Sequence, residues 1–129
     1  MAVGNRGAVR GLDALELRDL HATMRVEWIA RELHPWERAR DPRVAGQLFA
    51  QQCLRDVDAA IARLFDQLPE VDALEIRVLR EVGGLVLFEG LVERHEPALV
   101  QHLSPRMKLK SIGVRFHMSD GRLEPLSAG

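Results

Sequence analysis

The sequence contains few residues of several types, and each of these scarcities argues against a particular structure or function. Its 129 residues include one cysteine, two tryptophans, four phenylalanines and no tyrosine. The single Cys53 cannot form a disulfide within the chain, which favours a reducing compartment and a core position rather than a nucleophile. Few aromatic side chains leave few platforms on which single-stranded bases could stack. A formal net charge of −1 gives no overall attraction to nucleic acid or anionic lipid.

Long hydrophobic runs are also missing. No segment approaches the ~20 apolar residues of a membrane-spanning helix. The N-terminal stretch MAVGNRGAVRG contains no apolar run of the length found in signal peptides. We therefore expect a cytoplasmic protein without a membrane span. Hydrophobic residues make up 47% of the sequence and charged residues 29%, which is typical of one globular domain whose core requires no disulfide or metal.

The N-terminal region predicts an arm followed by a helix. Residues 1–10 are glycine-rich and unpatterned, so we expect them to be flexible. Residues 12–34 predict an N-terminal helix, because no glycine or proline interrupts residues 12–33 and good helix formers dominate. Two apolar stripes on nearly opposite sides would give this helix two neighbours. One stripe consists of Leu17, Leu20, Met24 and Trp28, and the other of Leu15, Ala22, Val26, Ile29 and Leu33.

Residues 42–118 predict an α-β-β-α-β order. Asp41 and Pro42 fit the N-cap and first position of a second helix, which ends near Leu68 because Pro69 follows. Apolar and charged residues alternate over residues 74–78, as expected for a half-buried strand. The buried stripe of the helix should consist of Val44, Leu48, Cys53, Val57, Ala60, Ile61, Leu64 and Leu68.

A second strand is predicted over residues 85–92, and the rest of the chain completes the fold. Glu96-Pro97 and Ser104-Pro105 begin two short helical segments. The second of these ends at Gly113, and residues 114–118 alternate as a third strand before a turn at residues 119–121. The predicted fold class is α+β: a three-stranded sheet packed on helices, with an additional N-terminal helix, in a single domain over residues 11–129.

The loop between the first two strands determines which side chains share a face. A two-residue turn would place Glu89 on the core face, whereas a three-residue loop at residues 82–84 avoids burying a carboxylate. The preferred register pairs Val78 with Phe88 and Arg77 with Glu89, and it likewise matches Ile76 with Gly90 and Leu74 with Val92. Val86, Phe88 and Val92 then face the core. The opposite face carries Leu79, Leu85, Leu87 and Leu91, so it should be covered either by the N-terminal helix or by another protein.

The second strand also carries a recognisable spacing. Gly84, Val86, Phe88, Gly90 and Val92 form the pattern G-x-V-x-F-x-G-x-V, which resembles the central strand signature of the BON domain. That family has an α-β-β-α-β unit whose last strand opens with a Gly-Val pair, as Gly113-Val114 would here. The resemblance covers residues 44–118 and implies a non-catalytic binding module for envelope or lipid surfaces or for self-assembly. Pro105, the additional N-terminal helix and the missing export signal depart from the family pattern.

The sequence also resembles a second family, whose members bind nucleic acid. Two short helices between the second and third strands also suit a type II KH-like fold, which binds single-stranded RNA through a G-x-x-G loop. The corresponding residues 103–106 read Leu-Ser-Pro-Arg and contain no glycine. In this alternative the phosphate contacts would come from basic residues around the last helix. They are Arg106, Lys108, Lys110 and Arg115.

No residue set indicates catalysis. Of the five histidines, only His95 and His102 share a helical region, and no cysteine or acid completes a metal-binding set with them. Ser104, Ser111 and Ser119 occupy cap or turn positions, and no G-x-S-x-G motif occurs. We therefore predict that the protein is not an enzyme and has no metal or cofactor.

The sequence favours a non-catalytic interaction or assembly module that binds a second copy of itself or another protein. Nucleic acid ranks behind protein as a partner, and a BON-like lipid surface is a further alternative. The contact is expected on the first apolar stripe or on the outer sheet face. The predicted partner-binding residues are Leu17, Leu20, Met24, Trp28, Leu85, Leu87 and Leu91.

Overall fold

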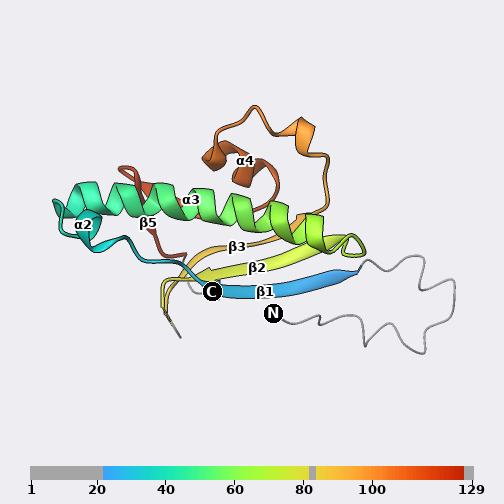
Figure 1. Cartoon of the computed structure of the whole chain (residues 1–129), viewed down its shortest axis with the longest axis horizontal. Coiled ribbons are helices and arrows are strands. Elements are labelled where there is room, and N and C mark those ends of the chain that lie inside the picture. Colours follow the sequence, from blue (N-terminus) through green and yellow to red (C-terminus); the bar gives the residue numbers. More distant parts are fainter. Residues whose placement is uncertain (1–21, 82–83, 127–129) are drawn as a thin grey trace, which may run out of the picture.

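The architecture is a three-stranded mixed sheet with helices against one face (Figure 1). The computed structural model describes residues 22–81 and 84–126. Strand β1 (Thr23–Ile29) pairs in parallel with the central strand β2 (Ala73–Leu79), and β2 pairs antiparallel with β3 (Val86–Glu93). The long helix α3 (Pro42–Gln67) connects β1 to β2 and lies across the sheet, preceded by the short helix α2 (Pro35–Arg38). The predicted α+β class is confirmed.

The helix predicted over residues 12–34 is wrong where the chain is described, because residues 23–29 form β1. Met24 and Val26 are buried while Arg25 and Glu27 are exposed, which is the two-residue period of a strand. The same apolar positions also fit a helical stripe. Pairing with β2 decides between the two, since it satisfies the main chain of both strands. The remaining part of the predicted helix, with Leu17 and Leu20, lies outside the described residues.

Helix α3 follows the prediction closely. The Asp41 side chain accepts a hydrogen bond from the Arg43 backbone N–H at 2.9 Å, and Pro42 occupies the first turn. The buried side includes four residues of the predicted stripe and three large side chains that the stripe omitted. The predicted ones are Cys53, Val57, Ile61 and Leu64, and the added ones are Phe49, Leu54 and Phe65. The other predicted positions, Val44, Leu48, Ala60 and Leu68, are half-buried.

The predicted register of β2 and β3 is confirmed from Leu74 to Val78, with Arg77 opposite Glu89. The register then shifts, so that Leu79 faces Val86 and Leu87 becomes the extra residue of a β-bulge. A bulge re-aims the side chain that it displaces. Leu87 accordingly lies in the core at 2% exposure instead of on the outer face.

The C-terminal region only partly matches the prediction. Helix α4 (Pro105–Ser111) begins at Ser104, whose hydroxyl accepts from the Met107 N–H, and a 3-10 turn η2 (Pro97–Leu99) precedes it. The predicted strand at residues 114–118 is not the third strand of the sheet, because β1 takes that place on the other side of β2. Only an isolated bridge at Arg115 joins β3, and the chain continues into a separate hairpin. The hairpin consists of β4 (His117–Ser119) and β5 (Arg122–Glu124).

Two glycines permit the close approach of the C-terminal segment to β3. A methyl group on Gly90 would overlap the Gly113 carbonyl oxygen. Gly113 itself has φ +103°, which side chains rarely adopt. Both glycines of the BON-like pattern in this region therefore serve one contact between β3 and the segment after α4.

Candidate interaction surface

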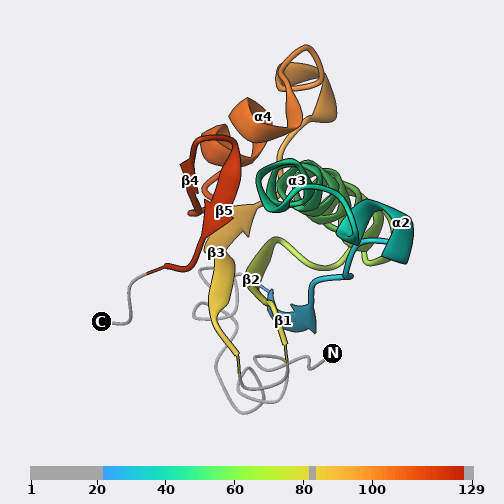
Figure 2. The same ribbon diagram turned by 90° about the vertical axis from the view of Figure 1, so that its left-hand side faces the viewer.

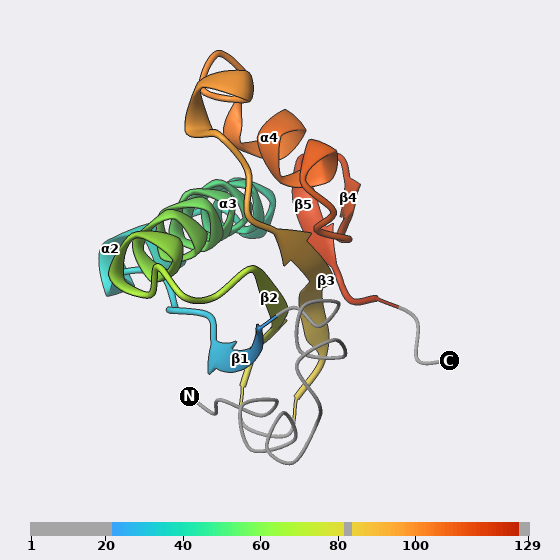
Figure 3. The ribbon, with the colours of Figure 1, turned by 90° about the vertical axis from the view of Figure 1, so that its right-hand side faces the viewer.

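The two edges of the sheet differ in how they are covered. The C-terminal segment covers part of the β3 edge, since Glu89 and Arg115 exchange backbone hydrogen bonds of 3.1 and 2.8 Å and the Leu126 N–H donates to the Val86 carbonyl at 2.9 Å. Figures 2 and 3 show the β4–β5 hairpin beside β3 and β1 on the opposite side of the sheet. Within residues 22–81 and 84–126, β1 has no strand on its far side.

The direction of the β1 main chain follows from its bonds to β2. The Ala30 N–H donates to the Leu79 carbonyl at 2.7 Å, and the Ala22 carbonyl accepts from the Ala73 N–H at 3.3 Å. Because main-chain groups of successive residues point to alternate sides of a strand, even-numbered residues of β1 bond to β2. Odd-numbered residues direct their N–H and C=O groups away from it. We call these groups the β1 edge: they belong to Thr23, Arg25, Glu27 and Ile29.

Apart from the charges of Arg25 and Glu27, the β1 edge lacks, among the described residues, the features that usually protect an exposed strand. It contains no proline and no lysine, and its pairing with β2 is regular over all seven residues. Proteins normally shield such an edge with prolines, lysines, bulges or a covering segment. The long, regular β1 edge is therefore suited to pairing with another strand.

Charged side chains cover the sheet face away from α3, which we call the outer face. Arg25 pairs with Glu75 at 3.1 Å, Arg77 pairs with Glu27 at 3.7 Å, and Arg115 forms an ion pair with Glu89. Strand register places four of these residues in one row across the sheet with alternating sign. The row reads Glu27, Arg77, Glu89 and Arg115. These solvated pairs contribute little stability individually, but they make the outer face electrically balanced.

An apolar groove lies on the other face, between β1 and α3. It has a volume of about 450 Å³. Trp28 is half-buried at the groove, and Ile29 beside it is 45% exposed. Apolar side chains thus adjoin the β1 edge where no described part of the chain covers them. The apolar lining of the groove includes Val26, Trp28, Ile29, Val57, Ala60 and Leu64.

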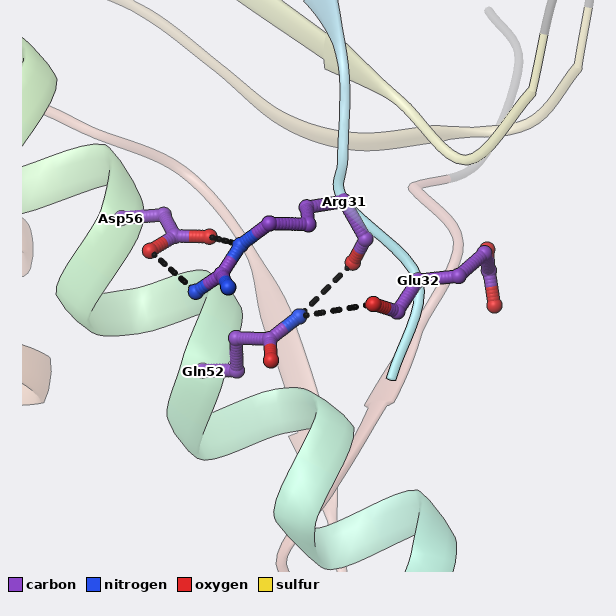
Figure 4. A network of polar contacts seen from close by, with 4 residues as sticks. All are labelled: Arg31, Glu32, Gln52 and Asp56. Carbon is purple, nitrogen blue, oxygen red and sulfur yellow. Dashed lines mark hydrogen bonds and ion pairs between the residues drawn. The ribbon is translucent and has the colours of Figure 1, made fainter. Parts of the chain in front are cut away.

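A polar network fixes the groove where β1 ends (Figure 4). Arg31 donates two hydrogen bonds of 3.1 Å to the Asp56 carboxylate on α3. This hydrogen bonding and the charge of Asp56 raise the pKa of Arg31. The Gln52 amide donates to the carbonyls of Arg31 and Glu32 at 2.8 and 3.4 Å. The exit of β1 is thereby tied to α3, so the groove is preformed.

The predicted partner-binding residues are distributed between the core and the surface. Met24 and Leu87 lie in the core at 3% and 2% exposure, so they are not accessible on the surface of this chain. Trp28 lines the groove. Leu85 and Leu91 are exposed, at 61% and 53%, but the bulge and the buried Leu79 separate them from the continuous leucine patch that was expected.

The predicted phosphate-binding residues are mostly engaged within the chain. Lys108 pairs with Asp58 at 3.1 Å, and the Lys110 ammonium lies 5.4 Å from the centroid of the Phe116 ring. Arg115 pairs with Glu89 on the outer face. Arg106 is exposed. Nearby acids and an aromatic ring therefore occupy most of the basic groups of the KH-like alternative.

Two further observations concern the single cysteine and metal-ligating side chains. Burial raises the pKa of the Cys53 thiol from 9.0 to about 12, so at neutral pH it is protonated and a poor nucleophile. No cluster of three or more metal-ligating side chains occurs among residues 22–81 and 84–126. Over the same residues, no helix has the length and hydrophobicity needed to cross a bilayer.

Comparison of the chain with protein-family models, with curated proteins and with solved structures found no match. The BON and KH resemblances stay predictions from the sequence. The candidate site consists of a strand edge that no described strand covers, an apolar groove beside it and a balanced row of charges.

Proposed function

We propose that this protein is a non-catalytic assembly module that associates with itself through the β1 edge and the adjoining groove. The observation that carries the proposal is the contrast between the two sheet edges. The C-terminal segment hydrogen-bonds to β3 at Glu89 and Val86, whereas β1 presents regular, unpaired main-chain groups among the described residues. Strand addition at such an edge is a common mode of protein association, because main-chain hydrogen bonds supply affinity and adjacent pockets supply specificity.

The charge distribution supports a protein partner over nucleic acid or a lipid surface. Binding to phosphate groups draws on several unpaired basic side chains gathered on one face. Here the outer face alternates in sign, and Lys108 on α4 is paired with Asp58. The β1 edge and the groove offer main-chain groups and apolar side chains instead, which suit another polypeptide.

Sedimentation velocity of the full chain over a range of concentrations tests the proposal. We expect a dimer that dissociates on dilution. Ile29→Asp should weaken the association at least about tenfold, because a half-exposed apolar side chain beside the β1 edge becomes charged and occurs twice in a symmetric dimer.

Leu99→Asp is the matched control, since Leu99 is 68% exposed on η2 and away from β1. It should leave the association unchanged. Circular dichroism of both variants verifies the fold. A folded chain that sediments as a monomer at every concentration would contradict the proposed function.

A further inference from the structure

We propose that the β1 edge binds the β1 edge of a second copy, antiparallel, about a twofold axis at Val26. The inference rests on the proposed function and specifies its geometry. The two sheets would join into one sheet of six strands. Three independent features of β1 favour this partner and this register: the direction of its main-chain groups, its charges and its apolar side chains.

The main chain permits the pairing. Antiparallel pairing about Val26 places Arg25 opposite the partner's Glu27 and Thr23 opposite the partner's Ile29. All of these residues direct their N–H and C=O groups outward, as the bonds of Ala22 and Ala30 to β2 imply. Each outward residue therefore meets an outward residue, and the strands form about eight hydrogen bonds. All seven residues of β1 take part.

The charges select this register over its neighbours. With the axis at Val26, Arg25 faces the partner's Glu27, and symmetry repeats the pair. An axis at Arg25 would place this arginine opposite its own copy, and an axis at Glu27 would oppose two carboxylates. Like charges directly opposite each other destabilise a strand pair, whereas opposite charges stabilise it.

The same register continues the charge row of the outer face. Within one chain the signs alternate from Arg115 through Glu89 and Arg77 to Glu27. Next across the axis comes the partner's Arg25, which already pairs with the partner's Glu75 in its own chain. The alternation of sign is therefore unbroken from one sheet into the other, with no unmatched charge at the junction.

The apolar face is also complementary. The axis places Trp28 opposite the partner's Met24, at a position where cross-strand side chains approach closely. An axis perpendicular to the sheet keeps both α3 helices on the same side and turns their grooves toward each other. The flank of α3 at the groove carries the small side chains Ala59 and Ala60, so antiparallel copies would present small side chains to each other. Association would cover Trp28, which a single chain leaves half-exposed.

Charge reversal on the β1 edge tests the register. Arg25→Glu makes the edge acidic and Glu27→Arg makes it basic, so each variant alone places like charges opposite each other twice. We expect each to weaken the dimer about tenfold or more in sedimentation. An equimolar mixture of the two variants should associate again, because an acidic edge then faces a basic one. Arg106→Glu and Glu93→Arg make the same charge changes away from β1 and should leave the wild-type affinity unchanged.

The outcomes separate this inference from the proposed function. Both single variants dimerising like the wild type, or a mixture that stays monomeric, would overturn the β1 pairing while self-association by another surface stood. A wild-type chain that is monomeric and folded at all concentrations would overturn both. Association of the mixture alone, with both single variants monomeric and folded, supports the pairing.

Amide hydrogen exchange of the wild-type chain provides a second measurement that is independent of variant folding. The Arg25 and Glu27 amides, which point away from β2, should be protected in the dimer and lose protection on dilution. The Val26 and Trp28 amides, which bond to β2, should stay protected throughout. Outward amides that exchange freely in the dimer would overturn the inference. So would outward amides that stay protected at every dilution, since residues of the same chain would then cover the edge.

Discussion

Arg94 joins the end of α3 to the start of β2, and its replacement should be among the most destabilising surface substitutions. Its guanidinium donates to the carbonyls of Phe65, Leu68 and Val71 at distances between 2.6 and 3.1 Å. It also lies over the Phe65 ring, 4.8 Å from the centroid. The last carbonyls of a helix have no partner within the helix, so Arg94 satisfies the Phe65 carbonyl near the end of α3. It also bonds to the Leu68 carbonyl, which accepts from the Val71 N–H as well, and to the Val71 carbonyl.

The expected magnitude follows from these contacts. Three carbonyls at about 1 kcal/mol each and a cation–π contact of about 0.5 kcal/mol give a loss of about 3.5 kcal/mol for Arg94→Ala. For a domain of this size, that corresponds to a fall in Tm of about 10–20 °C. Arg94→Lys keeps the charge, but a single ammonium group cannot span three carbonyls, so it should recover less than half of the loss.

Urea denaturation followed by circular dichroism measures the effect, with all variants at one protein concentration because association shifts apparent stability. Arg106→Ala is the control, since Arg106 is exposed on α4 and should change the free energy of unfolding by less than about 0.5 kcal/mol. An Arg94→Ala variant as stable as this control would refute the reasoning. So would an Arg94→Lys variant as stable as the wild type.

Three further predictions concern packing, titration and nucleic acid. Gly90→Ala should cost about 1–3 kcal/mol in urea denaturation, because the added methyl group overlaps the Gly113 carbonyl oxygen; an unchanged midpoint would contradict the close approach. Cys53 should resist iodoacetamide at pH 8 in the folded chain and react fully in urea, and rapid native labelling would contradict its burial. Because its folded pKa of about 12 exceeds the ordinary 9.0, its contribution to stability should be constant below pH 9 and be lost as the pH rises toward 12. Single-stranded RNA should show no salt-sensitive retention that depends on the basic residues of α4; retention abolished by Arg106→Glu with Lys110→Glu would favour the KH-like alternative.

The β2–β3 pairing could be predicted because the choice was between two registers and one of them buried a carboxylate. The placement of Arg77 opposite Glu89 follows from the sequence by that argument and is confirmed. The bulge at Leu87 could not be found in this way, since a register shift near a turn changes no residue in the alternating pattern. A leucine expected on the outer face therefore lies in the core.

The sequence predicts a helix at β1 because the apolar residues of this segment satisfy two periods. Met24 and Trp28 are four apart, as on a helix face, and Val26 between them completes the alternation of a strand. Pairing with β2, which lies 50 residues further along the chain, determines that this segment is a strand and not a helix. The apolar stripe predicts Trp28 as a contact residue, but strand order determines which strand is at an edge, so no local pattern could indicate that the main chain of this segment is unpaired.

The C-terminal segment lies along the β3 edge and not along the β1 edge, and this difference affects the size of any assembly. Under the proposed pairing, the described part of the three-stranded sheet offers one edge, β1, to which a neighbouring strand adds, so growth would end with a closed pair instead of a filament. The segment after α4 hinders the addition of a strand at the β3 edge. Loss of that segment would leave two unpaired strand edges on every molecule and convert a finite complex into an open-ended polymer.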